Sequence, residues 1–466
     1  MRSTALLLSL LLALPAGLAA RGPAPATLPL AVPGLAEAHL SPAHWTAALP
    51  DPDRVVLTPE QIAAQNARMQ AEDPSIHDLE ALPARIDGAQ VRGWIEALSK
   101  LPERELFDDT GRPVPSDALR DIQANAALDA VPASQATRHG MVVARADLRA
   151  FPTRLRVFHS AGDRDIDRFQ ESALFPGDPV VVLHESRDGE WYFVLSQRYA
   201  AWIEKQYVAE GDREAIHAWG RRAPFLVVTG ATARTAYTPE NPRVSDVQLE
   251  MGVRVPVLAE WPAMEAVNGQ LPSAHHVIEL PVRGVNGSLS FEPALLPRSA
   301  DVASDYLPLT EANLIRQSFK FLGERYGWGH SYNARDCSGF ASEIYRSFGV
   351  LIPRNTSAQA VSPALNRLPF DAGDSHAARV EALRETRPGD LVYIPGHVMM
   401  VIGHGNDGEV FAIHDTSGMS WKPEGAADDL VRLHLNGVVV TPILPMMSNA
   451  TTPTVDRITS IQRIRP

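Results

Sequence analysis

Hydrophobic positions recur at helical spacing in the early part of the chain. Thr58 is a predicted helix cap ahead of Pro59, which suits the first helical position, and core-type residues then follow along one side. Two further helices are predicted at residues 90–101 and 116–128. These patterns indicate a helical N-terminal domain over residues 58–135.

Short runs of alternating apolar and polar residues replace this pattern farther along the chain. The clearest is the segment 179–194, in which two strands flank the turn residues Asp188-Gly189. Small barrels are built from such short strands. The alternation therefore predicts two successive barrel-like β modules, over residues 136–214 and 222–300.

Helices and strands are mixed in the last region, residues 305–466. One helix is expected to begin at Cys337, because Phe340, Ile344 and Phe348 recur every four residues after it. The positive end of a helix stabilises a thiolate, which is the reactive form of cysteine. Cys337, the single cysteine of the chain, is therefore a candidate nucleophile. A buried, inert cysteine is the alternative.

Length and composition limit the class of protein. The 466 residues are enough for several compact domains. Hydrophobic residues make up 45% of the chain and charged residues 21%, which is typical of globular proteins and not of disordered or membrane-embedded ones. The formal net charge of −12 would repel a phosphate backbone over most of the surface, so no nucleic-acid partner is expected.

The first residues are typical of an export signal. Small residues follow the apolar stretch Ala5–Leu14, so we expect a signal peptide at residues 1–20, cleaved after Ala19 or Ala20. A membrane anchor is the alternative, but the stretch is shorter than the ~20 residues that cross a bilayer. We expect an exported protein, periplasmic or secreted, without stable membrane insertion after cleavage. Residues 21–57, rich in Pro and Ala, predict an extended arm.

Two strands near the C-terminus each carry a histidine that can serve as a base for the thiol. The turn at residues 403–408 separates these strands, and a symmetric closure pairs Val401 with Val410 and His397 with His414. Direct neighbours across strands have Cβ atoms ~4.5–5.5 Å apart, which suits a hydrogen bond between two imidazoles. A slip of one residue would send the rings to opposite faces, so the pairing depends on this register.

Other catalytic classes find little support in the sequence. No His-Glu-x-x-His motif is present and His275-His276 has nothing at ligand spacing, so neither a metal site nor a cofactor is expected. No Gly-x-Ser-x-Gly motif indicates a serine hydrolase. His404 competes with His414 for the role beside His397, but it lies in the turn.

Six short motifs follow one another in the order of a known family. They are Arg325–Gly329, Asp336–Phe340, Ile352–Gln359, Arg387–Leu391, Gly396–Val398 and Ile413–His414. On these motifs, residues 307–441 resemble the NlpC-type cell-wall cysteine peptidases, which have a papain-like fold. Met399-Met400 depart from the small or aromatic residues that often follow the histidine in that family.

This resemblance implies a role for each member of a catalytic triad. Cys337 would be the nucleophile, His397 the base and His414 the residue that orients the base. The implied substrate is a peptidoglycan stem peptide, cut between D-glutamate, through its γ-carboxyl, and the following diamino acid. Five residues would line the pocket near D-glutamate and its preceding residue: Tyr326, Trp328, Asp336, Ser338 and Ser357.

Multidomain members of this family place bacterial SH3-like barrels ahead of the catalytic domain. The first barrel narrows the cleft, and an acidic residue and a tyrosine from it bind the free amine of L-alanine. Asp167 and Tyr199 are the candidates here, although both also suit ordinary barrel positions. The implied fold class is α+β and multidomain, with an N-terminal helical segment, two SH3-like β-barrels and a C-terminal papain-like NlpC-type catalytic domain.

Several alternatives stay open from the sequence. The pocket aromatics could be core residues, Asp336 could be only a helix cap, and Ser338 and Ser357 could have structural roles. The whole chain could be a catalytically inactive protein that binds the cell wall, or an amidase or acyltransferase on the same fold, since these share a thioester intermediate. Retention of Cys337, His397 and His414 together favours the enzyme.

Overall fold

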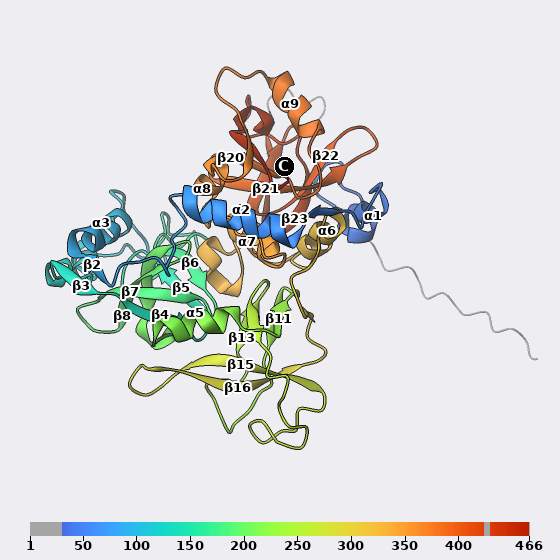
Figure 1. The fold of residues 1–466 in the computed structure, drawn as a ribbon. Coiled ribbons are helices and arrows are strands. Elements are labelled where there is room, and N and C mark those ends of the chain that lie inside the picture. Colours follow the sequence, from blue (N-terminus) through green and yellow to red (C-terminus); the bar gives the residue numbers. More distant parts are fainter. Residues whose placement is uncertain (1–29, 424–428, 466) are drawn as a thin grey trace, which may run out of the picture.

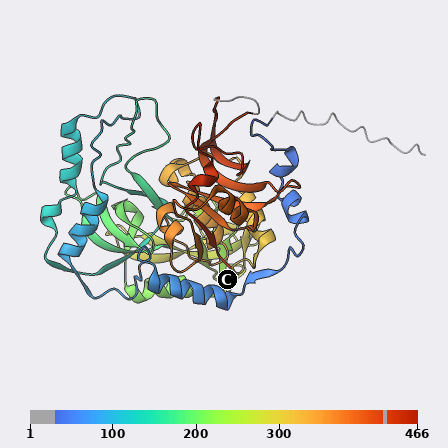
Figure 2. The same cartoon turned by 90° about the horizontal axis from the view of Figure 1, so that it is seen from above.

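A computed structural model describes residues 30–423 and 429–465 of the chain. The expected signal peptide and the first part of the arm lie outside the described residues. Figure 1 shows a barrel with its helices, a second β module below it and the C-terminal domain above. Seen from above, the first barrel and the C-terminal domain lie side by side (Figure 2). Among the described residues, no helix is both long enough and apolar enough to cross a membrane.

The predicted helices near the N-terminus are present. They are α2 (Pro59–Glu72), α3 (Gly88–Leu98) and α4 (Ser116–Asn125). Thr58 caps α2 as expected, because its side chain accepts from the N–H of Gln61 while its own N–H donates to the Gln61 side chain. The segment expected to be an extended arm contains a short helix and a short strand, α1 (Pro42–Ala47) and β1 (Val55–Leu57).

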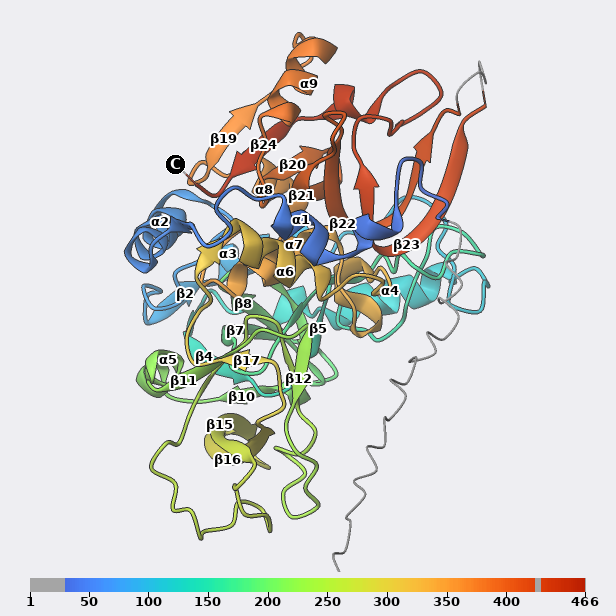
Figure 3. The same cartoon turned by 90° about the vertical axis from the view of Figure 1, so that its right-hand side faces the viewer.

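The N-terminal segment up to α2 packs on the C-terminal domain. Trp45 of α1 is 3% exposed, and its ring centroid lies 5.2 Å from that of Phe411. Asn66 of α2 donates to the carbonyl of Gly349 at 2.7 Å and accepts from the N–H of Leu351 at 2.9 Å. Figure 1 shows α2 running along the C-terminal domain, and Figure 3 shows it at the edge of this domain, near β19. The arm and α2 therefore contribute buried side chains to the hydrophobic core of the C-terminal domain.

The first barrel is an antiparallel sheet with the strand order β10-β4-β7-β8-β9-β5-β6. The predicted hairpin is confirmed, since Val182 pairs with Val194 across it. α3 packs on this sheet, where Val91 shares an apolar cluster with Trp202. The strands are β4 (Arg138–Val142), β5 (Ala146–Arg149), β6 (Gln170–Leu174), β7 (Pro179–Glu185), β8 (Trp191–Ser196), β9 (Ala200–Glu204) and β10 (Val208–Glu210), and a small pair, β2 (Arg85–Asp87) with β3 (Ser134–Ala136), lies beside α3.

The second β module consists of separate small sheets. α5 (Arg213–Arg221) leads into it, and its strands pair as β14-β11-β17, β12-β13 and β15-β16. The long β15-β16 hairpin lies at the bottom of the molecule in Figure 1. The strands are β11 (Phe225–Val228), β12 (Thr232–Arg234), β13 (Gln248–Glu250), β14 (Arg254–Pro256), β15 (His275–Arg283), β16 (Leu289–Pro297) and β17 (Val302–Ala303). A second SH3-like barrel stays a prediction.

The C-terminal domain is an antiparallel sheet, β19-β24-β20-β21-β22-β23, with helices on both faces. α7 packs on one face, where Ile344 and Val438 share a cluster, and α9 packs on the other, where Leu383 contacts the cluster of Met399. The elements are β18 (Leu309–Thr310), which pairs with β1, α6 (Glu311–Phe319), α7 (Cys337–Arg346), α8 (Thr356–Val361), β19 (Asn366–Pro369), α9 (His376–Arg384), β20 (Leu391–Ile394), β21 (His397–His404), β22 (Val410–Trp421), β23 (Val431–Pro442) and β24 (Ser460–Arg463).

The register between β21 and β22 differs from the symmetric closure expected. Met400 pairs with Ile413 and Val401 with Ala412, and a bulge follows Val401. The predicted pairing of Val401 with Val410 is wrong, because the hairpin closes nearer its turn than expected, with His404 opposite Val410, and the bulge offsets only one residue of this shift. The partner of Val401 is displaced by two positions, so each side chain stays on its expected face of the sheet.

Candidate active site

Cys337 is the first residue of α7, as the periodicity predicts. Asp336 caps the helix through its carboxylate, which accepts a backbone N–H of the first turn at 2.7 Å. The thiol is 5% exposed; its sulfur lies 3.6 Å from Oγ1 of Thr356 and accepts a hydrogen bond from the N–H of Val398. Because Val398 directly follows His397, the sulfur lies at the start of β21.

The two predicted histidines are in contact. Nε2 of His397 lies 2.7 Å from Nδ1 of His414, and Nε2 of His414 lies 2.8 Å from Oγ1 of Thr441 on β23. For Nδ1 of His397 to accept a proton, its Nε2 must carry the hydrogen and donate to His414, which then donates to Thr441. The sequence motifs do not indicate Thr441, because only the pairing of β22 with β23 brings it to this ring.

Burial keeps both reacting groups neutral. Loss of water, with a smaller contribution from the charge of Asp336, raises the pKa of the Cys337 thiol to about 12. Burial lowers the pKa of His397 to about 4 and moves the pKa of His414 well below its ordinary value. Desolvation therefore outweighs the helix-end effect expected from the sequence. The arrangement suits a neutral imidazole that takes the thiol proton as the sulfur attacks.

A cavity of about 290 Å³ opens beside Cys337, between the C-terminal domain and the first barrel. It brings together all five pocket residues that the family resemblance implies. The barrel contributes Gln170, Glu171 and Tyr199, and the C-terminal domain contributes Tyr326, Trp328, Asp336, Cys337, Ser338, Arg354, Asn355, Thr356, Ser357 and Gly396. A wider hollow of about 560 Å³ adjoins it at Tyr326, Trp328 and Gly396 and contains His397. The two hollows therefore extend to either side of the thiol and its base.

The turn at Trp328–Asn333 docks the C-terminal domain onto the first barrel. Nε1 of Trp328 donates to the carbonyl of Gln170 at 3.0 Å, and Nε2 of Gln170 donates to the carbonyl of Gly329 at 2.8 Å. Gly329 has φ 56, and a Cβ there would lie 2.9 Å from Cγ of Gln170. Close approach of the two modules at the cavity wall therefore requires glycine at this position.

Arg354 lines the cavity and forms hydrogen bonds to residues of both modules. Its Nη1 and Nη2 lie 3.1 and 2.9 Å from the two carboxylate oxygens of Asp336, and its Nε donates to Oγ of Ser172 on β6 at 2.7 Å. Nη1 also donates to Ser338 at 3.0 Å. Burial opposes ionisation of Asp336, but the charge of Arg354 overcomes it and lowers the pKa of this carboxyl to about 2. The motif Ile352–Gln359 contains Arg354, so the sequence offered a signal for this role.

The first barrel brings Tyr199 to the cavity but not Asp167. The side chain of Asp167 is fully buried, pairs with Arg149 at 2.5 Å and accepts two backbone N–H groups at 3.2 and 3.0 Å. Glu171 on β6 lines the cavity in its place and accepts a hydrogen bond from the hydroxyl of Tyr199. Burial raises the pKa of both Glu171 and Tyr199. Asp167 is therefore not the acidic residue that lines the cavity, because its carboxylate binds Arg149 and two backbone N–H groups inside the barrel.

A thiol at a helix start, a histidine on the adjoining sheet and a cavity beside the sulfur define the class as a papain-like cysteine peptidase domain. Comparison with known families agrees with this class. Residues 323–422 match the NlpC/P60 family, and residues 156–204 match an SH3 domain of the SH3b1 type. The chain thus contains an NlpC/P60-type domain and an SH3-type domain, which agrees with the resemblance drawn from its motifs. Among residues 30–423 and 429–465, no group of His, Cys, Asp or Glu side chains is suited to hold a metal ion.

Characterised relatives match parts of the chain. It is 26% identical over 255 residues to the gamma-D-glutamyl-L-lysine dipeptidyl-peptidase of Bacillus cereus, which covers 51% of this chain and 66% of the relative. It is 31% identical over 98 residues to the probable endopeptidase p60 of Listeria welshimeri, covering 20% of this chain and 16% of the relative. The chain therefore spans less than two thirds of the length of these relatives.

A solved structure has a similar fold over most of the chain. The NlpC/P60 endopeptidase from Photobacterium damselae subsp. piscicida superposes with a TM-score of 0.70, covering 88% of this chain and 94% of that one. Sequence identity between the two is 19%, so the likeness concerns the fold alone.

Proposed function

We propose that the protein is a cysteine peptidase that hydrolyses the bond between γ-D-glutamate and the following diamino acid in peptidoglycan stem peptides. One observation carries the proposal: the nucleophile Cys337 lies in a cavity whose far wall is the Glu171–Tyr199 pair of the first barrel. The Bacillus cereus relative, whose name is gamma-D-glutamyl-L-lysine dipeptidyl-peptidase, supports this bond specificity.

The residues in contact give an order of proton transfers. Sγ of Cys337 attacks the γ-carbonyl carbon while its proton passes to Nδ1 of His397, and the oxyanion accepts hydrogen bonds from backbone N–H groups at the start of α7. The tetrahedral intermediate collapses to a thioester, and the amine of the diamino acid leaves with the proton from His397. Water then attacks the thioester and gives one proton to His397, which passes it to the departing sulfur and regenerates the thiol. The released γ-carboxylic acid loses its remaining proton to solvent.

The barrel side of the cavity suits the N-terminal end of a short peptide. A free ammonium group between the Glu171 carboxylate and the Tyr199 hydroxyl would make charge-assisted hydrogen bonds that an N-acetylated peptide cannot make. We propose this pair, in place of Asp167 and Tyr199, as the contact for the amine of L-alanine. Released peptides are then better substrates than intact murein.

The location of the protein stays a proposal that rests on the residues 1–20. An export signal would bring the enzyme to the periplasm or beyond the cell, where peptidoglycan is. The proposed substrate and the proposed location are therefore consistent with each other.

Incubation with L-Ala-γ-D-Glu-diaminopimelate, followed by mass analysis of the products, tests the function. The expected products are L-Ala-D-Glu and free diaminopimelate, and Cys337→Ala should form neither while keeping its thermal unfolding temperature. Release of L-alanine instead would place the cleavage at the bond between L-alanine and D-glutamate. No product from this or other stem peptides would favour a catalytically inactive wall-binding protein.

A further inference from the structure

A further cavity, of about 280 Å³, lies where α2, the first barrel and the end of α7 meet. We call it the junction cavity. Asn66 lines it from α2, Asp178 and Arg198 line it from the barrel, and Arg346 and Tyr306 line it from the C-terminal side. None of these residues lines the cavity beside Cys337. The junction cavity is therefore separate from the candidate active site.

Positive charge in the junction cavity exceeds negative charge. Nη2 of Arg346 pairs with Oδ1 of Asp178 at 2.6 Å, but its Nη1 is buried and has no hydrogen-bond partner among the described residues. Arg198 is partly buried and makes no hydrogen bond or ion pair with any residue of 30–423 or 429–465. Two guanidinium groups thus share a single lining carboxylate among the described residues.

The positive charge in the junction cavity lacks a matching acceptor among the described residues. Burial, reinforced by repulsion from Arg346, lowers the pKa of Arg198 to about 10, so the group is still charged at neutral pH. A charge that is largely removed from water is ordinarily paired. An anion in the junction cavity could therefore accept hydrogen bonds from Arg198 and from Nη1 of Arg346.

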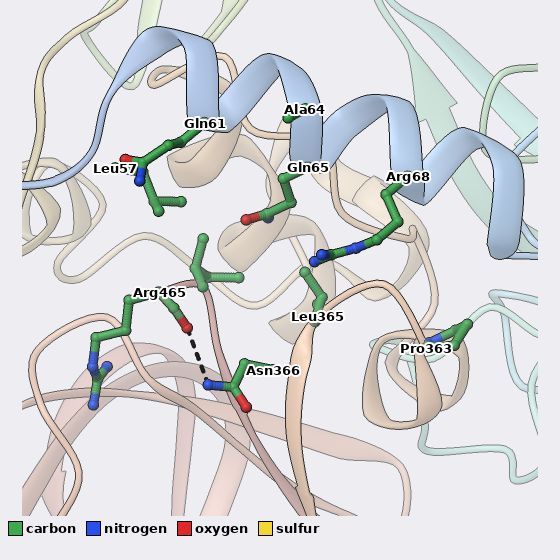
Figure 4. Close-up of a pocket in the computed structure, with 10 residues that line it drawn as sticks. Leu57, Gln61, Ala64, Gln65, Arg68, Pro363, Leu365, Asn366 and Arg465 are labelled. Atoms are coloured by element: carbon green, nitrogen blue, oxygen red, sulfur yellow. Dashed lines mark hydrogen bonds between the residues drawn. The ribbon is translucent and has the colours of Figure 1, made fainter.

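A neighbouring cavity shows the ordinary situation. The space between α2 and β19, of about 480 Å³, is also lined by two arginines (Figure 4). There Nε of Arg68 donates to the carbonyl of Ala364 at 3.2 Å, and Nη2 of Arg465 pairs with Asp390 at 2.9 Å. Both guanidinium groups already have acceptors, so this second space offers a matched control.

We propose that the junction cavity binds a small oxyanion, a phosphate or a carboxylate group, which accepts hydrogen bonds from Arg198 and from Nη1 of Arg346. Guanidinium groups match the geometry of such anions. The bound anion would connect the barrel to the C-terminal domain, because Arg198 belongs to one and Arg346 to the other. This inference does not depend on the proposed hydrolysis.

Calorimetric titration of the full chain with inorganic phosphate, at constant ionic strength set with sodium chloride, tests the site. Arg198→Gln should weaken phosphate binding by about tenfold or more, since one charge-assisted contact is lost. Arg68→Gln, which changes the control cavity, should leave the affinity unchanged. Arg198→Lys keeps the positive charge but loses the two parallel N–H donors of the guanidinium group, so this variant should bind phosphate with intermediate affinity.

Thermal unfolding gives a second readout that a general salt effect would not reproduce. In chloride buffer without phosphate, Arg198→Gln should melt at a higher temperature than the unchanged protein, because an unpaired, partly buried charge beside Arg346 has been removed. Phosphate should raise the melting temperature of the unchanged protein and of Arg68→Gln, but not of Arg198→Gln. The order of the two melting temperatures should therefore reverse at saturating phosphate.

Acetate in place of phosphate distinguishes the two anions. Stabilisation by acetate and not by phosphate would assign a carboxylate ligand, and stabilisation by phosphate would assign a phosphate group. The proposal is overturned if neither anion stabilises the protein beyond chloride, or if Arg198→Gln responds to the effective anion as the unchanged protein does.

Discussion

The imidazole of His397 contacts that of His414 although the two residues are not directly opposite each other in the sheet. Their ring nitrogens lie 2.7 Å apart, while the nearest paired residues are Met400 and Ile413. The displacement of two positions keeps both rings on one face, so a diagonal contact replaces the direct one expected from the sequence. The hydrogen bond between His397 and His414 therefore forms only when the two imidazole rings are turned toward each other along this diagonal.

Loss of His414 should affect the chemical step more than binding. In His414→Ala the base loses its orienting partner and kcat should fall by about 100-fold or more, with little change in KM. His414→Gln should recover part of this activity, because an amide can form one hydrogen bond to the ring. Steady-state kinetics on the tripeptide measures both. A larger loss from His404→Ala would show that the wrong histidine has been paired.

Thr441 should act on catalysis through His414. Thr441→Val removes one neutral hydrogen bond of 2.8 Å, and kcat should fall by about 3–10-fold while KM stays constant. Thr441→Ser keeps the hydroxyl and should retain near-full activity. Equal losses in the serine and valine variants would indicate a packing role for the methyl group, and would remove Thr441 from the proton path.

Glu171 should set the preference for a free amine. The unchanged protein should cut free L-Ala-γ-D-Glu-diaminopimelate at least ~100-fold better than its N-acetylated form, which corresponds to ~2.7 kcal/mol. Glu171→Gln should reduce that ratio to below about tenfold, since the charge-assisted contact is lost. Glu190→Gln, an exposed change in the same barrel, serves as the control. Equal kcat/KM for both peptides in the unchanged protein would mean an open cleft.

The pH dependence of alkylation should reveal a neutral thiol. Because burial raises the pKa of Cys337 to about 12, the thiolate fraction and the rate of reaction with iodoacetamide should rise about tenfold per pH unit up to pH ~10. A free thiol with a pKa near ~8.5 levels off in that range and provides the comparison. A plateau at acidic pH would instead indicate a preformed thiolate–imidazolium pair with His397.

The arm should contribute strongly to stability. Trp45→Ala removes a side chain that is 3% exposed, and the free energy of unfolding should fall by about 3–5 kcal/mol. Tyr237→Ala, at a position 77% exposed, should change it by less than about 0.5 kcal/mol. Denaturant titration of both variants checks this. An unchanged midpoint for Trp45→Ala would mean that the arm contributes little to the core.

Local signals in the sequence predicted the elements that carry the chemistry. Thr58 and Asp336 precede helices as caps, and each cap acts within one turn, so its partner is near in the chain. The apolar repeat after Cys337 places the nucleophile at a helix start for the same reason. Such interactions can be predicted without knowing where distant parts of the chain lie.

Residues that act across modules could not be assigned in this way. Asp167 and Glu171 are both acidic and lie four positions apart, but only the folded barrel turns one toward Arg149 and the other toward Tyr199. Thr441 reaches its partner through sheet pairing alone. The arm likewise has weak local periodicity, because its apolar residues fill gaps in a surface formed elsewhere.

The contact between Asn66 and Gly349 joins positions 283 residues apart, and this separation has a consequence for synthesis. At about 5–20 residues per second, α2 leaves the ribosome roughly 14–57 s before the residue it binds. Until then its apolar side, which includes Ile62 and Met69, has no surface to cover. Contacts of such long range form slowly. The helix α2, which is made early, is therefore among the last elements to dock, and its docking completes the folding of the nascent protein.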